Sequence, residues 1–222
     1  MTVVEHDGRL WGLGRHVEHD PASLGWPAPR ASQLVTVQHE HHGPVLDQGE
    51  LGSCTGNAIA QALNTGPLLP AGRRLLTEQD AVAIYSWGTH HDGVPGVWPP
   101  TDTGSSGNAV AKAARHLGLI RSWTHAFGLQ HCLEALVLQP VIVGIPWLSG
   151  MFDPRPDGTL AVTGDVAGGH EVALIGLDVE RRDVTVLNSW GSGWGMGGAA
   201  RLFWSDLDFL LRQQGDVTVP HL

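Results

Sequence analysis

The chain has 222 residues, of which 42% are hydrophobic, and this is enough for one large domain or two subdomains that share a core. Its formal net charge is −9 and it has no run of lysines or arginines, which excludes the charge pattern of a nucleic-acid-binding protein. No apolar run approaches the roughly 20 residues that a membrane helix needs. Residues 1–15 also lack the apolar core of a secretion signal. We therefore expect no nucleic-acid partner, no membrane partner and no standard export.

Residues 1–35 show no clear periodicity, and prolines interrupt them at Pro21, Pro27 and Pro29. We expect an extended N-terminal arm that lies over the body of the protein. A regulatory propeptide is the alternative interpretation, although the arm is short and has no strong helical pattern.

Three histidines cluster just after this arm, at His39, His41 and His42. Such a cluster suggests a metal site as one hypothesis. No cysteine lies near it, and Gly43-Pro44 follows at once, so we interpret the segment as a polar loop or strand end. Whether the cluster binds a metal stays open at this level.

Four segments have the apolar spacing of amphipathic helices. The first begins near Cys54, and the second begins at Thr77, where the residues up to Asp80 resemble a capping box. A Gly- and Pro-rich loop over residues 89–107 separates the second helix from the third, and loops of this length are often functional. The four predicted helices end at these positions: Gly66, Gly88, Gly118 and Pro140.

After the fourth helix, the pattern changes to short apolar runs with many β-branched residues, separated by turns that contain Gly or Asp. Strands are predicted over residues 141–145, 171–177, 184–187, 199–203 and 217–219. The N-terminal half is thus predicted to be helical and the C-terminal half to be antiparallel β, with a crossover near residues 119–140. This combination predicts an α+β fold.

The two cysteines have different surroundings. Cys54 follows the Gly-rich turn that begins at Gln48, and it lies at or near a helix N-terminus, where free backbone N–H groups and the helix dipole favour a thiolate. Cys132 lies in an apolar helical pattern and is interpreted as a small, buried hydrophobic residue. We expect both thiols to be reduced.

A thiolate nucleophile needs a base, and the base needs a group that orients it. His170 follows two glycines and opens a predicted strand, so a sheet holds its backbone while the glycines leave room for a substrate. Asn188 ends the next strand, where its amide oxygen can accept the imidazole N–H and Trp190 can keep water away. Gln48 can pair its amide with the Cys54 backbone N–H to hold a developing oxyanion.

The sequence resembles the papain-like (C1-type) cysteine peptidases in the identity and order of four residues: Gln48, Cys54, His170 and Asn188. Asn188 opens the stretch Asn-Ser-Trp-Gly-x-Gly-Trp-Gly, which is the most specific part of the resemblance. The resemblance spans roughly residues 44–204.

This resemblance implies a catalytic domain over residues 36–222. A helical subdomain at about residues 44–125 would carry the cysteine, and a β-barrel-like subdomain at about residues 126–222 would carry the histidine and asparagine. The active-site cleft would lie between the two subdomains.

The resemblance also implies where a substrate binds. Gly104 and Ser105 stand where the family has a Gly-Gly pair that binds the substrate backbone, and Gly169 and Trp190 flank the catalytic residues. Glu171 stands where the family often has a small residue, in the pocket for the second residue upstream of the cleaved bond. A carboxylate there favours a basic side chain, whereas the alternative interpretation is a solvated strand residue.

Some residues depart from the family pattern. The family commonly has a cysteine shortly before the nucleophile that forms a disulfide across the helical subdomain, whereas this region reads Glu50-Leu51-Gly52. Thr55 follows the nucleophile in place of an aromatic residue, and no long helical propeptide precedes it. These departures fit the bacterial and phage-like branch, which needs no oxidising compartment. We therefore expect a cytoplasmic protein, and a phage origin or release by cell lysis stays open.

The predicted function is thiol-dependent hydrolysis of peptide bonds in a peptide or protein substrate, by an endopeptidase that needs no metal and no cofactor. Cys54 attacks the peptide carbonyl, His170 protonates the leaving amine and Asn188 aligns the histidine. An ion pair with His170 is expected to lower the pKa of Cys54. The alternatives are an amidase or transpeptidase acting on cell-wall peptides, a phage assembly-processing factor, and a catalytically silent binding module.

Overall fold

Five α-helices and nine β-strands follow one another in the computed structural model, which describes all 222 residues. The helices are α1 (Cys54–Leu63), α2 (Glu78–Thr89), α3 (Gly107–His116), α4 (Gly128–Leu138) and α5 (Trp204–Arg212). The strands are β1 (Thr2–His6), β2 (Arg9–Leu13), β3 (Val37–Gln38), β4 (Ser122–His125), β5 (Val141–Leu148), β6 (Val166–Asp178), β7 (Asp183–Leu187), β8 (Ala199–Phe203) and β9 (Asp216–His221). Two short 3-10 helices are η1 (Pro21–Gly25) and η2 (Ser149–Met151). No helix is both long and apolar enough to span a membrane.

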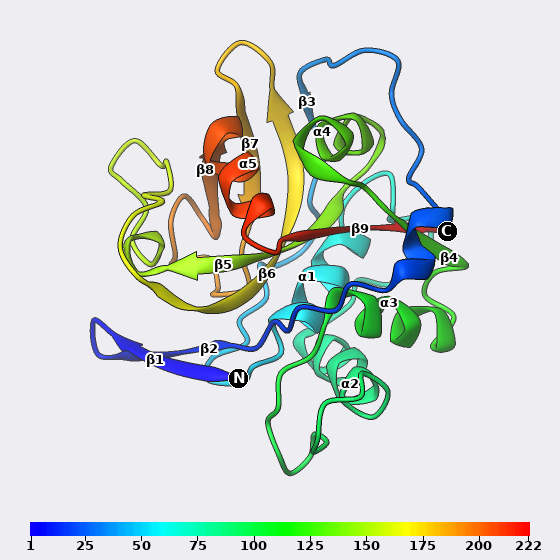
Figure 1. Cartoon of the computed structure of the whole chain (residues 1–222), viewed down its shortest axis with the longest axis vertical. Coiled ribbons are helices and arrows are strands. Elements are labelled where there is room, and N and C mark those ends of the chain that lie inside the picture. Colours follow the sequence, from blue (N-terminus) through cyan, green and yellow to red (C-terminus); the bar gives the residue numbers. More distant parts are fainter.

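The helices α1, α2 and α3 pack against one another and form the helical half of the molecule (Figure 1). All ten residues of α1 are buried, so this helix is the centre of that half. The predicted capping box is present at the start of α2, where Thr77 and Asp80 exchange side-chain to backbone hydrogen bonds. Asn64 follows α1 and bonds both the N–H and the C=O of Leu76, which fixes the loop between the first two helices.

The C-terminal half is built on a seven-stranded antiparallel sheet in the order β4-β9-β5-β6-β7-β8, with β3 pairing to the far end of β6. β6 is the longest strand, and it pairs with β5 along its first part and with β7 and β3 along its last part. The register places Ile145 of β5 opposite His170 of β6. The backbone of His170 is therefore held in place by the pairing of β6 with β5.

Each face of the sheet covers a different part of the hydrophobic core. On β6, Ala173 and Ile175 pack into the helical half, whereas Val172 and Leu174 pack into the larger core that also holds residues of α4 and α5. Side chains on a strand alternate between the two faces. Since both faces are covered, residues 172–177 of the strand form a continuous apolar run rather than an alternation of apolar and polar residues.

The first 35 residues contain structure that the sequence analysis did not predict. β1 and β2 pair as an antiparallel hairpin, with Thr2 opposite Leu13. The turn is Asp7-Gly8, whose φ angles of 51° and 75° match the preference of two-residue hairpins for Asp-Gly. After β2, the chain passes in front of α1 in Figure 1 and reaches η1 beside β4.

The predicted division into a helical first half and an antiparallel second half is confirmed. The five predicted strands correspond to β5, β6, β7, β8 and β9. Strand β4 and helix α5 were not predicted. The fourth predicted helix, α4, packs on β6 and α5 rather than on the other three helices.

Candidate active site

Cys54 is the first residue of α1, and its side chain is fully buried. The turn before it is fixed from the side, because the N–H of Gly52 donates to the Asp102 carboxylate at 2.8 Å. The backbone N–H groups of Glu171 and Thr55 point at the sulfur. The thiol thus lies at the positive end of a helix and against the edge of β6.

His170 and Asn188 come from neighbouring strands. His170 is on β6 and Asn188 directly follows β7, and the imidazole Nε2 lies 2.8 Å from the amide Oδ1. The other ring nitrogen, Nδ1, has no hydrogen-bond partner. Trp147 and Trp190 pack on the imidazole with ring centroids 4.8 Å away, and both indoles are fully buried. These rings exclude water from the bond that orients the imidazole.

Gln48 joins the two halves of the molecule beside Cys54. Its N–H donates to the carbonyl of Ser189 at 3.0 Å, and its side-chain Oε1 accepts from the Ser189 hydroxyl at 2.6 Å. The amide Nε2 is consequently turned toward the cleft, where it donates to the carbonyl of Gly12 at 2.9 Å and to that of Leu51 at 2.7 Å. A peptide carbonyl therefore already occupies the donor that the sequence analysis assigned to an oxyanion.

Burial sets the protonation of the cysteine and the histidine. Burial raises the pKa of the Cys54 thiol to about 12, and the N–H of Gly14 offsets only part of this effect. Burial also lowers the pKa of His170 to about 4, against the effect of its bond to Asn188. Burial therefore favours the neutral thiol and the neutral imidazole and opposes the expected ion pair. A segment of the chain lies over Cys54, with the N–H of Gly14 directed at the sulfur.

The covering segment is residues 9–16, which we call the cleft segment. Arg15 donates its N–H to the carbonyl of Gly169 at 3.0 Å. On the other side of the cleft, the N–H of Ser105 donates to the Gly14 carbonyl at 2.8 Å. The Ser105 carbonyl accepts from the N–H of His16 at 2.7 Å. The cleft segment is thus hydrogen-bonded on both sides, as an extended peptide ligand would be.

The other end of the cleft segment is held by aromatic and charged groups. Trp11 is 7% exposed and packs against Trp190 with a centroid separation of 4.4 Å and an angle of 43° between the ring planes. The guanidinium of Arg9 lies 3.9 Å from the Trp11 ring and bonds Asp47 at 2.5 Å. Trp190 therefore contacts both His170 and the cleft segment.

Small residues allow the cleft segment to approach this closely. A Cβ atom added to Gly14 would overlap the backbone of Gly52, and one added to Gly169 would overlap the carbonyl of Arg15. Gly104 has a φ of 77°, and a Cβ there would overlap the carbonyl of Gly14. The walls of the cleft are thus shaped to accept a peptide backbone.

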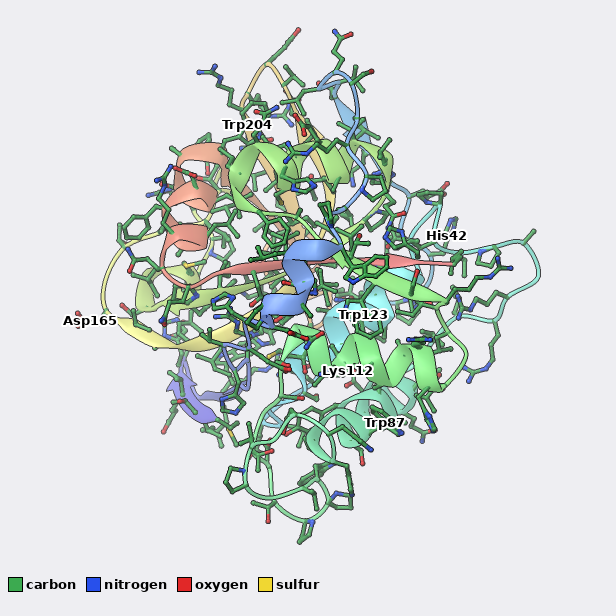
Figure 2. All side chains as sticks on the ribbon, turned by 45° about the vertical axis from the view of Figure 1, so that its right-hand side comes forward. His42, Trp87, Lys112, Trp123, Asp165 and Trp204 are labelled. Carbon is green, nitrogen blue, oxygen red and sulfur yellow. The ribbon has the colours of Figure 1, made fainter.

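Beyond the cleft, Glu18 fastens the chain to α3. Its carboxylate accepts from the Ser106 hydroxyl, from Asn108 at 2.8 Å and from Lys112 at 3.3 Å. Lys112 is labelled on α3 in Figure 2, below the ribbon of η1. The cleft segment is therefore anchored at both of its ends.

Glu171 is fully buried, so its interpretation as a solvated strand residue is wrong. It faces the side chain of Arg15, which enters the protein at the end of the cleft and bonds the Asp216 carboxylate. All five residues expected to bind substrate therefore meet the cleft segment: Gly104, Ser105, Gly169, Glu171 and Trp190.

The remaining cysteine and the clustered histidines lie elsewhere. Cys132 is free and fully buried in α4, as predicted. His39 bonds the carbonyl of Leu136 at 2.7 Å, whereas His41 bonds the Thr65 hydroxyl at 3.0 Å. The rings of these two histidines thus have separate protein partners.

Sequence reasoning missed two residues that hold the loop around the site. Tyr85 donates its hydroxyl to Asp102 at 2.5 Å and accepts from the Gly104 N–H at 2.9 Å. Asp102 also accepts from Gly52, so it ties the turn before Cys54 to the loop that contacts the cleft segment. The only sequence signal was the position of Asp102 in a long Gly- and Pro-rich loop.

Solved structures with a similar fold are cysteine proteases. Xylellain, a cysteine protease from Xylella fastidiosa, matches with a TM-score of 0.73 at 18% identity, over 95% of this chain and 96% of that chain. The chain has the papain-like fold. This confirms the predicted α+β fold class, with a helical and a β subdomain.

Further similar structures support the same fold. Digestive procathepsin L 3 of the Tenebrio molitor larval midgut gives a TM-score of 0.63 at 18% identity, over 95% of this chain and 76% of that chain. The Carica candamarcensis cysteine protease CMS1MS2 in complex with E-64 gives 0.53 at 18% identity, over 81% of this chain and 92% of that chain. No protein-family model matches the sequence, and no curated protein matches it.

Proposed function

We propose that this protein is a papain-like cysteine peptidase that hydrolyses peptide bonds through Cys54. The observation that carries this proposal is the peptide in the cleft. The chain's own cleft segment lies over Cys54 with its backbone bonded to Ser105 on one side and Gly169 on the other. A site that binds an extended peptide across a cysteine at a helix N-terminus, beside a histidine and asparagine pair, is suited to acyl transfer from peptides.

The proposed mechanism uses four side chains. Cys54 attacks the substrate carbonyl, and His170 takes the thiol proton and returns it to the leaving amine. Asn188 keeps Nε2 of the imidazole occupied, so that Nδ1 faces the reaction. Water then hydrolyses the thioester with His170 as the base.

Gln48 supplies the oxyanion donor in this mechanism. Its Nε2 already donates to a peptide carbonyl, that of Gly12, which supports its role as a donor to the tetrahedral intermediate. The Ser189 hydroxyl and carbonyl hold the amide in this orientation. We therefore propose Ser189 as a positioning residue for Gln48.

The cleft segment must leave before a substrate enters. The direction of its chain explains why it is not itself cut. His170 protonates the leaving amine and packs on Trp190, so the part of the substrate that leaves as the amine lies on the side of Trp190. The part that stays bound to Cys54 as the acyl group lies on the side of Ser105. The acyl side of a substrate is N-terminal to the cleaved bond. The cleft segment runs the other way, from Trp11 on Trp190 to Arg15 beside Ser105. We thus propose that residues 1–35 act as a regulatory arm and that residues 36–222 form the catalytic domain.

The departures from the family pattern support a bacterial or phage-like assignment within this fold. Leu51 and Thr55 replace the bridging cysteine and the aromatic residue, and xylellain matches over nearly the full length of both chains. We propose that the protein belongs to this branch and acts without a disulfide. A cytoplasmic location stays a prediction.

The experiment is hydrolysis of an unfolded protein, such as reduced casein, by the full chain with the cleft segment weakened by Trp11→Ala. We expect fragments to appear with time and no fragments after Cys54→Ala in the same background. Turnover that persists after Cys54→Ala would exclude this mechanism.

A further inference from the structure

Gln61 is a polar side chain in the middle of a buried helix. Helix α1 begins at Cys54, and Gln61 lies seven residues later, about two turns along the helix and on nearly the same face. Its side chain is fully buried. Burying an amide is unfavourable unless its donor and its acceptor both have partners, so the partners of Gln61 show why an amide is present here.

The two ends of the Gln61 amide bond two separate segments of the backbone. Its Oε1 accepts from the N–H of Leu46 at 3.1 Å, and its Nε2 donates to the carbonyl of Asn188 at 3.1 Å. A reversed amide would place two donors against each other and two acceptors against each other, so the partners fix this orientation. The amide thus joins α1 to the chain before it and to the chain that follows β7.

Leu46 belongs to the segment that carries Gln48, the proposed oxyanion donor, two residues later. The Leu46 carbonyl accepts from the N–H of Gly191 at 2.9 Å, and the N–H of Gln48 donates to the carbonyl of Ser189 at 3.0 Å. Gln61 therefore fixes the start of this segment, and residues 189–191 fix the rest of it.

Asn188 is the second partner of Gln61, and it orients the imidazole. Its Oδ1 lies 2.8 Å from Nε2 of His170, and its own N–H donates to the carbonyl of Gly198 at 3.0 Å. The bond from Gln61 to the Asn188 carbonyl holds the same residue from α1. Because the backbone of Asn188 determines where its Oδ1 lies, a shift of this backbone would move the acceptor away from the imidazole.

We propose that Gln61 is a positioning residue that sets the spacing of the catalytic groups. Its one amide connects the helix that begins with Cys54, the segment that carries Gln48 and the residue that orients the imidazole. Gln61 acts through Gln48 and Asn188 and does not itself touch the substrate. This inference rests on the proposed peptidase function. A displacement of about 1 Å between such groups lowers turnover by about a hundredfold.

The first test compares Gln61→Met with Asn64→Leu, both in the Trp11→Ala protein, which is the parent. Methionine has nearly the length of glutamine but forms neither bond. Asn64 is the matched control, because this buried amide at the end of α1 accepts from the N–H of Leu76 and donates to its carbonyl, each at 2.8 Å. Both variants therefore lose two equivalent bonds, but only Gln61→Met loses bonds to the segments of the site.

The substrate is fluorescently labelled, reduced casein. We expect Gln61→Met to lower kcat by about tenfold to a hundredfold and to leave KM within about threefold of the parent. Asn64→Leu should lower the temperature of unfolding but leave kcat within about threefold. An unchanged kcat in Gln61→Met, or an equal loss of kcat in the two variants, would overturn the inference.

A second variant, Gln61→Glu, gives a pH profile that a purely structural role would not produce. A neutral carboxyl can accept from the Leu46 N–H and donate its O–H to the Asn188 carbonyl, whereas an ionised carboxylate has no donor. Burial raises the pKa of such a carboxyl above its ordinary value of about 4.3. The ratio of kcat in Gln61→Glu to kcat in the parent should therefore fall as pH rises through this pKa, and taking the ratio removes the titrations that the two proteins share. A ratio that stays constant while circular dichroism shows a folded protein would contradict the proposed role.

A readout without turnover separates this inference from the proposed function. The imidazole N–H that bonds Asn188 is followed in proton–nitrogen correlation spectra and assigned by its absence in His170→Ala. Its exchange with water should be faster by about tenfold or more in Gln61→Met and unchanged in Asn64→Leu. If no casein is cleaved but the exchange changes in this way, the peptidase proposal fails and the role of Gln61 stands. If casein is cleaved and Gln61→Met matches the parent in both kcat and exchange, the function stands and the inference is wrong.

Discussion

Replacing Trp11 with alanine should open the cleft without unfolding the protein. Trp11 packs on Trp190 at 4.4 Å and carries the Arg9 guanidinium at 3.9 Å, so it is the main apolar anchor of the cleft segment. Burying a large apolar side chain contributes about 1.5–3 kcal/mol, and an aromatic pair adds about 0.5–1.5 kcal/mol. The substitution destabilises the closed state, in which the indole is buried. It leaves the open state nearly unchanged, because there the indole is already exposed to water.

A loss of about 3 kcal/mol corresponds to a change of roughly a hundredfold in the open-to-closed equilibrium, at about 1.4 kcal/mol per factor of ten. The rate at which iodoacetamide labels Cys54 follows the open fraction. We therefore expect labelling of Cys54 in Trp11→Ala to be faster than in the wild type by about two orders of magnitude.

Two controls are built into the chain. Leu10→Ala changes the adjacent residue, which is 38% exposed on the same strand, and should leave the rate within about threefold of wild type. Cys132 is fully buried in the core away from the cleft, so it reports global unfolding. Equal labelling rates for Cys54 in both variants, or faster labelling of Cys132 together with Cys54, would refute the reasoning.

The other predictions concern the residues around the nucleophile and one helix terminus. Asn188→Ala in the Trp11→Ala background should lower kcat by roughly 10- to 1,000-fold without abolishing turnover, because the imidazole keeps its place on β6 but loses its orienting acceptor; an unchanged kcat would count against that role. Asp102→Ala should loosen the turn before Cys54 and raise KM for peptides. Asp102→Asn keeps an acceptor for the Gly52 N–H, so its KM should rise less. Equal KM values in the two variants would count against the role of Asp102 in holding this turn. Asp80→Asn should lower the free energy of unfolding by about 1 kcal/mol at neutral pH through loss of the capping box. The hydrogen bond from Arg74 and the capping bonds hold the pKa of Asp80 below its ordinary value of 3.8, so this contribution is present above pH 3.8 and is lost as pH falls through the lowered pKa; denaturant melts of both proteins should converge in acid, and a constant difference would contradict the assignment.

Local sequence patterns predicted a helix or strand correctly where the tertiary structure favours the same element. The apolar runs that became β5 and β6 were predicted, because strands covered on both faces remain apolar throughout. The capping box at Thr77 set the start of α2 correctly. Helix α5 was missed because Trp204 follows a predicted strand without a capping side chain.

The N-terminal arm shows where sequence patterns were insufficient. Asp7-Gly8 is a strong hairpin signal that was overlooked. The path of residues 9–16 could not be predicted, because the hydrogen bonds that hold them join them to Ser105 and Gly169 far along the chain. Those hydrogen bonds join backbone atoms, which are the same in every residue, so the residue types in the sequence do not reveal them.

The same limitation applies to the protonation of the site. The order of His170 and Asn188 in the chain was enough to predict their pairing, which the structure shows. Whether the thiol is charged depends on its burial, which raises the pKa of Cys54 where the sequence analysis expected it to be lowered. The environment of Glu171 depends in the same way on Arg15 and Asp216.

The most direct test of the account is the site of covalent labelling by a thiol-directed epoxysuccinyl inhibitor. The Trp11→Ala protein would be incubated with the inhibitor, digested and mapped by mass spectrometry, with His170→Ala in the same background as the comparison. The account predicts modification at Cys54 and none at Cys132, with loss of the Cys54 label after His170→Ala. Equal labelling of the two cysteines, or labelling of Cys54 that is unchanged by His170→Ala, would contradict it.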